Sequence, residues 1–214
     1  MDHKQRDKRV RVLVKRLNKA RKAQAKKIDI LCNDFVSAQR EFIKRLGAIS
    51  FAANFYEAIV GTGDLDVLLN TAGKLIKEQI PDANISFFLR GAENFELHLL
   101  ENERPITFEQ QHLERCFTTA LVNDICRSNK VCTLDNLLSM GLQASPLVVN
   151  KISAVAIPIG RLGASVGFIL VICSVENKLS CEQLSRLCSV TPGLARAIAC
   201  CRSFSPADEQ KITP

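Results

Sequence analysis

The sequence is poor in the residues and motifs on which catalytic and cofactor sites most often depend. Its 214 residues contain no Trp, one Tyr and three His, of which His3 lies at the very start. It has no Gly-x-Ser-x-Gly, His-Glu-x-x-His or P-loop pattern and no cluster of paired carboxylates. A nucleophile, a base and an orienting group cannot be assembled from what remains. We therefore expect a protein that is not an enzyme and that uses no metal and no cofactor.

Long apolar runs are missing as well. The longest, Ser153–Ile159 and Val166–Val175, fall far short of the roughly 20 residues that a membrane-spanning helix needs. Residues Met1–Arg9 are almost wholly polar, which does not fit a signal peptide. The nine cysteines are odd in number and include no C-x-x-C spacing, so we expect reduced, mostly buried thiols. These features predict a cytoplasmic protein.

Positive charge is concentrated at the start of the chain. Met1–Lys27 holds twelve Lys or Arg against Asp2 and Asp7, a net of +10, whereas the whole chain carries +7, so the remainder is mildly acidic. Such an arm attracts the phosphates of nucleic acid or of an anionic surface. The alternative is a solvated helix end, because the arm has no aromatic side chain to stack on bases. The candidate polyanion contacts are Lys8, Arg9, Arg11, Lys15 and Arg16.

A heptad repeat runs through Val10–Ile59, and its roughly fifty residues predict a helix about 75 Å long. Apolar residues fill most a and d positions, with polar interruptions at Arg21, Gln24 and Arg45. Either two copies pair along this seam, or its C-terminal half folds onto the chain's own body; a monomeric helix with a frayed end is the third alternative. The residues expected at a parallel dimer interface are Ile28, Leu31, Phe35, Phe42, Ile49 and Ile59.

The rest of the sequence alternates helices and strands. Gly61 is expected to cap the long helix in a left-handed conformation, and Asp64 to cap the next helix, Leu65–Ile80. A hairpin follows, with strands at Asn84–Arg90 and Phe95–Glu101 around a turn at 91–94. The later predicted elements are a helix from Thr107 to Cys126, a short strand Val131–Leu134, a helical turn Asp135–Met140, strands Ile152–Ile159 and Ser165–Cys173, and a helix from Ser180 to Cys201. Thr107 with Gln110 and Ser180 with Gln183 are capping-box patterns.

This order of elements resembles the GAF domain family. The most specific stretch is Ser153-Ala-Val-Ala-Ile-Pro-Ile-Gly160, followed by Gly163, Gly167-Phe-Ile-Leu-Val and the terminal helix. The resemblance covers about Ala48–Phe204 and implies an α+β fold, an antiparallel sheet with helices on both faces, an architecture that PAS-like folds share loosely. It also implies a ligand cavity on one face, closed by the variable segment Thr107–Asn150, and a parallel dimer bundle made by the first and last helices.

Domain boundaries follow from this resemblance. We expect a basic arm and coiled-coil helix over residues 1–47, a GAF-like domain over 48–204 and a flexible tail over 205–214. The long N-terminal helix then precedes the GAF-like domain directly.

The sequence departs from the ligand signatures of that family. Asn177-Lys178 lies where cyclic-nucleotide-binding members carry Asn-Lys, but no Phe-x-x-x-Asp-Glu follows it. His98 and His112 lack the companion motif that a bilin or a haem requires. We expect the pocket to be lined by Ser86, Phe88 and Arg90, which share one face of their strand, together with His98. The alternative is that Ser86 and Arg90 lie at a strand edge in water.

The sequence is compatible with three functions. The favoured one is a non-enzymatic sensory or regulatory module that binds an unidentified small molecule, dimerises through its first and last helices and signals to a separate output protein by helix rearrangement. The second is a dimeric adaptor that binds nucleic acid or an anionic surface through the basic arm. The third is a sulfoxide-reductase-like enzyme, as some GAF-like proteins are, which would depend on Cys116, Cys126 and Cys132.

Overall fold

The computed structural model of the chain describes residues 3–91, 94–100, 115–145, 149–161 and 164–204. It divides into two compact units, Met1–Ser50 and Phe51–Pro214. Among the described helices, none combines the length and the apolarity that crossing a bilayer requires.

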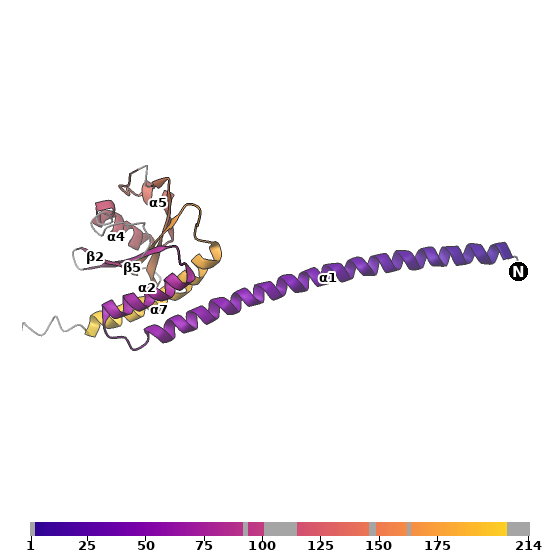
Figure 1. Ribbon diagram of the computed structural model, residues 1–214, viewed down its shortest axis with the longest axis horizontal. Coiled ribbons are helices and arrows are strands. Elements are labelled where there is room, and N and C mark those ends of the chain that lie inside the picture. Colours follow the sequence, from indigo (N-terminus) through magenta and orange to yellow (C-terminus); the bar gives the residue numbers. More distant parts are fainter. Residues whose placement is uncertain (1–2, 92–93, 101–114, 146–148, 162–163, 205–214) are drawn as a thin grey trace, which may run out of the picture. The chain divides into compact units, whose positions relative to one another are not determined.

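The first unit is made of one helix, α1 (His3–Ile59), which continues to the start of the second unit (Figure 1). Every residue from Arg6 to Leu46 is exposed, including the large apolar ones. The long helix predicted by the heptad repeat is therefore confirmed. Its side chains between 6 and 46 have no contact that buries them within the chain.

The second unit is built around a five-stranded sheet of order β2-β1-β5-β4-β3, in which every neighbouring pair is antiparallel. Figure 1 shows α2 and α7 on one side of the sheet and α4 and α5 on the other, so the predicted fold class is confirmed. The strands are β1 (Asn84–Arg90), β2 (Phe95–Leu99), β3 (Cys132–Thr133), β4 (Ile152–Arg161) and β5 (Ala164–Ser174). The helices are α2 (Leu65–Gln79), α4 (Thr119–Ser128), α5 (Leu134–Ser139) and α7 (Cys181–Phe204).

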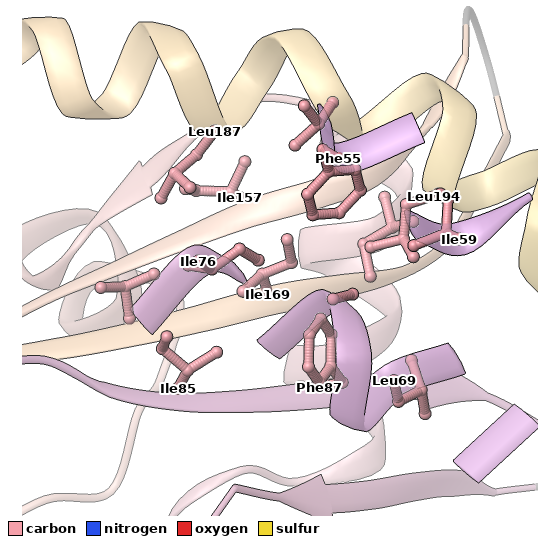
Figure 2. Close-up of a cluster of buried hydrophobic side chains, with 14 of the residues drawn as sticks. Phe55, Ile59, Leu69, Ile76, Ile85, Phe87, Ile157, Ile169, Leu187 and Leu194 are labelled. Atoms are coloured by element: carbon pink, nitrogen blue, oxygen red, sulfur yellow. The ribbon is translucent and has the colours of Figure 1, made fainter. Parts of the chain in front are cut away.

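The main core lies between the sheet and the helices α2, α7 and the end of α1. Figure 2 shows side chains from these helices meeting those of the strands. From α1, Phe51, Phe55 and Ile59 are spaced four apart, so they share one face of the helix, and all three are buried. Ile85, Phe87 and Leu89 of β1 face the same core. Alternating strand residues and one face of each helix thus close a single apolar layer.

Predicted helix ends are confirmed at several places. Gly61 has φ of +81°, the left-handed conformation that suits a helix C-terminus. The Asp64 side chain accepts a 2.9 Å hydrogen bond from the Val67 amide and caps α2. Ser180 and Gln183 form a reciprocal capping box, with 2.9 and 3.2 Å bonds between each side chain and the other residue's amide. The predicted capping box at Thr107 lies outside the described residues.

The helix predicted over Thr107–Cys126 is wrong in its described part. The chain is not helical at Phe117 and Thr118, and α4 begins only at Thr119. The Thr118 hydroxyl accepts a 3.3 Å hydrogen bond from the Leu121 amide, so Thr118 starts a new helix instead of continuing one. Phe117 is therefore placed by a bend, which directs its ring toward the sheet.

Candidate functional site

The two faces of β1 meet different partners, as the sequence predicted. Ile85, Phe87 and Leu89 pack toward α2 and α7, whereas Phe88 belongs to a second buried cluster with α4 and α5. Ser86 has the same alternation as Phe88 and is only 2% exposed. Arg90 ends the strand and is exposed. Ser86, Phe88 and Arg90 thus share the α4 side of the sheet, where the ligand cavity was expected.

His98 does not join them, so the predicted four-residue pocket is wrong in this residue. In the β1–β2 hairpin, His98 pairs directly with Phe87, and directly paired residues project from the same face of a sheet. His98 therefore faces α2, where its Nδ1 lies 3.4 Å from Asp66 Oδ1. The same ring lies 3.8 Å, through Nε2, from Glu96 Oε2. His98 links a strand to the first turn of a helix and is separated from Phe88 by the sheet.

Four phenylalanines fill the space between the sheet and α4. Phe88 stacks on Phe168 of β5 with centroids 4.7 Å apart and planes 10° apart. Phe117 lies 4.8 Å from Phe88, and Phe95 of β2 lies 5.5 Å from it. We call Phe88, Phe95, Phe117 and Phe168 the aromatic cluster. Its centre occupies the position where the resemblance implied a cavity, so a ligand there would have to displace or extend this packing.

A β-bulge places a polar group beside this cluster. The β4–β5 pairing shifts register at Ile159/Gly160, which leaves one unpaired residue in β5. Ser165 is 6% exposed and its hydroxyl bonds the backbone oxygens of Ile159 and Gly167. Ser165 and the Arg90 guanidinium both lie near enough to the Cys126 thiol on α4 to act on its pKa. The α4 side of the sheet therefore combines an aromatic floor with a Ser, a Cys and an exposed Arg.

The thiols in this region are poor nucleophiles. Burial raises the pKa of the Cys116 thiol above its ordinary value of 9.0. Burial also raises the pKa of Cys126, and the smaller opposing effects of Ser165 and Arg90 do not reverse the direction. Because the thiolate is the reactive form, a raised pKa lowers the reactivity of both thiols. Their described surroundings do not provide the activated cysteine that a reductase would need.

A groove that the sequence did not indicate lies between α2 and the hairpin. Its volume is about 770 Å³. Lys77 lies at one wall and donates a 2.6 Å hydrogen bond from Nζ to the Ala83 backbone oxygen. Lys74 and Lys77 are three residues apart on a helix, a spacing that any solvent-facing helix can show, so no sequence signal marks them. The lining residues are Asn70, Lys74, Lys77, Glu78, Pro81, Ala83, Ile85, Leu99 and Leu100.

The predicted dimer residues of α1 separate into two groups. Ile28, Leu31, Phe35, Phe42 and Ile49 are exposed over 59%, 67%, 63%, 62% and 65% of their surface. We call these five residues the α1 seam. Ile59 was predicted to belong with them, but it is 3% exposed within the core of its own chain, where Phe55 and Leu194 also lie. Ile59 is therefore removed from the predicted pairing surface.

The described residues offer no group of three or more His, Cys, Asp or Glu that is placed to hold a metal ion. His112 lies outside the described part of the chain.

Asn177 donates a 3.4 Å hydrogen bond to Asp82 Oδ2, which ties the loop before α7 to the loop before β1.

Comparison with known proteins rests on structure. No protein-family model and no curated protein matches the sequence. The GAF domain of a phosphoenolpyruvate-protein phosphotransferase from Coxiella burnetii superimposes with a TM-score of 0.57 and 13% identity, over 74% of this chain and 96% of that one. The GAF domain of the Acinetobacter phosphoenolpyruvate-protein phosphotransferase gives 0.54 and 13%, over 75% and 97%.

A third solved structure is the chromophore-binding domain of a bacteriophytochrome from R. palustris. It superimposes with a TM-score of 0.52 and 13% identity, over 72% of this chain and 61% of that one. At such low sequence identity, structural similarity shows that the folds are alike and does not identify a ligand. The sheet order, the helices on both of its faces and these superpositions agree: the chain has the fold of a GAF domain.

Proposed function

We propose that this chain is a non-enzymatic regulatory domain that acts as a homodimer, its two copies paired in parallel along α1. The observation that carries this proposal is the α1 seam. Its five large apolar side chains all occupy a or d positions of one heptad frame and are each more than half exposed in the single chain. Such a row, spaced at seven residues, is the pattern by which two helices interlock as a coiled coil.

The energetics favour pairing. Burying a side chain of this size contributes about 1.5 to 3 kcal/mol, and a dimer buries five from each chain. The summed burial free energy of these ten side chains exceeds most of the range of roughly 4 to 15 kcal/mol that association costs in lost translational and rotational freedom. Arg45 interrupts the repeat at a d position, but its Nε lies 3.1 Å from Glu41 Oε1 on the same helix. Because this carboxylate offsets its charge, Arg45 weakens the pairing less than an isolated arginine would.

The α1 residues that enter the core of their own domain are not those of the α1 seam. They are Phe51 and Phe55, at heptad positions c and g, and Ile59, at a d position beyond the end of the seam. One helix therefore has separate residues for its own core and for a second copy. This division supports dimerisation without unfolding of either domain.

The regulatory input is assigned to the α4 side of the sheet. Ser86, Arg90, Ser165 and the aromatic cluster offer the mixture of apolar lining and few polar groups that small-molecule sites use. Phe88 lies on this side, whereas its neighbours in β1, Phe87 and Leu89, pack on the opposite side against α2 and α7. A ligand that shifts Phe88 would thus shift β1 against α2 and α7. We assign signalling to that movement, read by a separate output protein.

Sedimentation equilibrium at micromolar concentration tests the dimer. The wild-type chain should have twice the 23.7 kDa mass of one copy. Phe42→Asp should give the single-chain mass, because it places a carboxylate in the seam of both helices. The matched control is Ser37→Asp, which adds the same charge at an exposed c position and should leave the dimer intact. A single-chain mass for the wild-type chain would overturn the pairing.

Sensing is tested separately by native mass spectrometry of the chain purified from its own host. The expected result is a reproducible added mass, lost in Arg90→Ala and kept in Lys151→Ala, a change on the exposed surface away from β1. If the added mass is never found, or if Arg90→Ala leaves it unchanged, the α4 side is not the input site. The dimer proposal does not depend on either result.

A further inference from the structure

We propose that the N-terminal part of α1, from Arg6 to Lys27, binds the phosphate backbone of double-stranded nucleic acid. Seven of its basic residues, which we call the basic face, share heptad positions b, c and f. They are Lys8, Arg9, Lys15, Arg16, Lys19, Lys22 and Lys26, and all are exposed. In this stretch Asp7 is the only carboxylate, so the charge of the basic face is almost unopposed.

The basic face lies on the opposite side of α1 from the pairing residues. Val10, Val14 and Leu17 occupy a and d positions, which point toward a paired helix, whereas b, c and f positions point away from it. Pairing and phosphate binding therefore use different sides of the same helix. A dimer would present two basic faces, directed outward.

The dimensions and charge suit a duplex. Lys8 and Lys26 are eighteen residues apart, about 27 Å along a helix, or roughly four fifths of one turn of a nucleic acid duplex. A duplex carries about one phosphate charge per 1.7 Å of its axis, so several lysines and arginines can reach phosphates at once. Since the helix offers charge without a recognised base-reading motif, the binding is expected to ignore sequence.

Single strands and bilayers fit the same residues less well. Phe35 is the first Phe, Tyr or Trp of the chain, so the basic stretch has no aromatic side chain on which unpaired bases could stack. From Asn18 to Lys27 the helix has no apolar residue larger than Ala. Of the apolar residues before it, Val10, Val14 and Leu17 occupy a and d positions, and only Val12 lies at a b, c or f position. A helix that inserts into a membrane surface needs a continuous apolar face. This last point rests on the proposed pairing, so binding and mass are measured on the same samples.

The test is a fluorescence titration of the full chain against a labelled duplex of about 20 base pairs, between about 50 and 200 mM salt. If five phosphates are neutralised, affinity should fall about five-hundred-fold over this range. Two duplexes of unrelated sequence should bind alike. Changing five residues of the basic face, Lys8, Arg9, Lys15, Arg16 and Lys19, together to Gln should reduce the logarithmic salt slope by about 0.9 for each phosphate that is no longer neutralised. The same variant should show no measurable binding at the higher salt.

A matched control separates the basic face from net charge. Lys74, Arg127, Lys130, Lys151 and Lys178 are exposed residues of the second unit, and changing them to Gln removes the same charge. This variant should bind as the wild-type chain does. Equal weakening in both variants, no duplex binding at low salt, or tighter binding to phosphatidylcholine vesicles with about 30% phosphatidylserine would each overturn the proposal. Sedimentation of the same samples shows whether the dimer persists, so failure of the pairing and failure of the basic face remain distinguishable.

Discussion

Phe88 lies at the centre of the aromatic cluster and is fully buried. Phe88→Ala should lower the free energy of unfolding by about 3 to 5 kcal/mol, because three neighbouring rings are left facing a cavity. Urea unfolding followed by circular dichroism measures this. Phe95→Ala, at the half-buried rim of the same cluster, should cost about 1 to 2 kcal/mol. Equal destabilisation by the two variants would show that Phe88 is not the central ring.

The buried thiols predict a stability that falls in alkaline solution. Burial raises the pKa of Cys116, Cys126 and Cys173 in the folded chain. Below about pH 9 these thiols are protonated in both states, so their contribution to stability is fully present. Above it the unfolded chain releases the protons first, and stability is lost as pH rises through the raised values. Urea unfolding under reducing conditions at several pH values should show the decline.

Variants at buried and exposed cysteines show whether the buried thiols cause the alkaline decline in stability. Cys116→Ala with Cys126→Ala should make the alkaline decline shallower, whereas Cys181→Ala, a change at an exposed cysteine, should leave it unchanged. The variants differ from one another only at these cysteines, so the rest of each chain does not affect the comparison. The same slope in every variant would mean that the thiols are as accessible when folded as when unfolded.

Among the elements, α1 and α7 meet at a glycine. A Cβ atom added at Gly193 would overlap the ring of Tyr56, whose hydroxyl donates a 2.8 Å hydrogen bond to the Ser189 backbone oxygen. Gly193→Ala should therefore cost about 1 to 3 kcal/mol of unfolding free energy, since the two helices must move apart. Thermal unfolding measures the change. Gly63→Ala meets nothing within 4 Å and should be neutral. A neutral Gly193→Ala would contradict this close packing.

The hairpin shows how far sequence reasoning could go. The alternation in Asn84–Arg90 correctly separated Phe87 from Phe88, because successive residues of a strand face opposite sides. The turn at 91–94 also implies that Arg90 pairs with Phe95, and counting back from there pairs Phe87 with His98. The information that His98 faces α2 was thus already in the sequence. Polarity predicts the wrong face for this histidine, whereas the register of the hairpin predicts the right one.

Other features depend on tertiary contacts that periodicity does not encode. The bulge at Ile159/Gly160 gives no distinct sequence signal, yet it determines the setting of Ser165. The break at Phe117 was hidden by an apolar spacing of four that continued through it, and Thr118 ended the helix by capping the next one. Ile59 fits the heptad frame as well as Ile49 does. Only the packing of the second unit shows that it is buried in its own core.

At the scale of the whole molecule, α1 carries two proposed binding surfaces, one for a second copy of the chain and one for a polyanion. The α1 seam is apolar and the basic face is charged, and they take different heptad positions. A second copy and a polyanion can therefore be bound together. Phe42→Asp should therefore weaken duplex binding only through loss of the second basic face, whereas neutralising the basic face should leave the mass of the dimer unchanged.

Disulfide trapping along α1 shows whether two copies pair in parallel and in register. In a chain whose exposed Cys32, Cys181 and Cys200 are replaced by Ser, Leu31→Cys places a thiol at a d position. In a parallel dimer the two copies of this residue face each other closely enough for a disulfide. Mild oxidation should convert most of the chain to a covalent dimer, whereas Ser37→Cys, at an outward c position, should convert little. Equal trapping at both positions, or none at Leu31, would contradict the account.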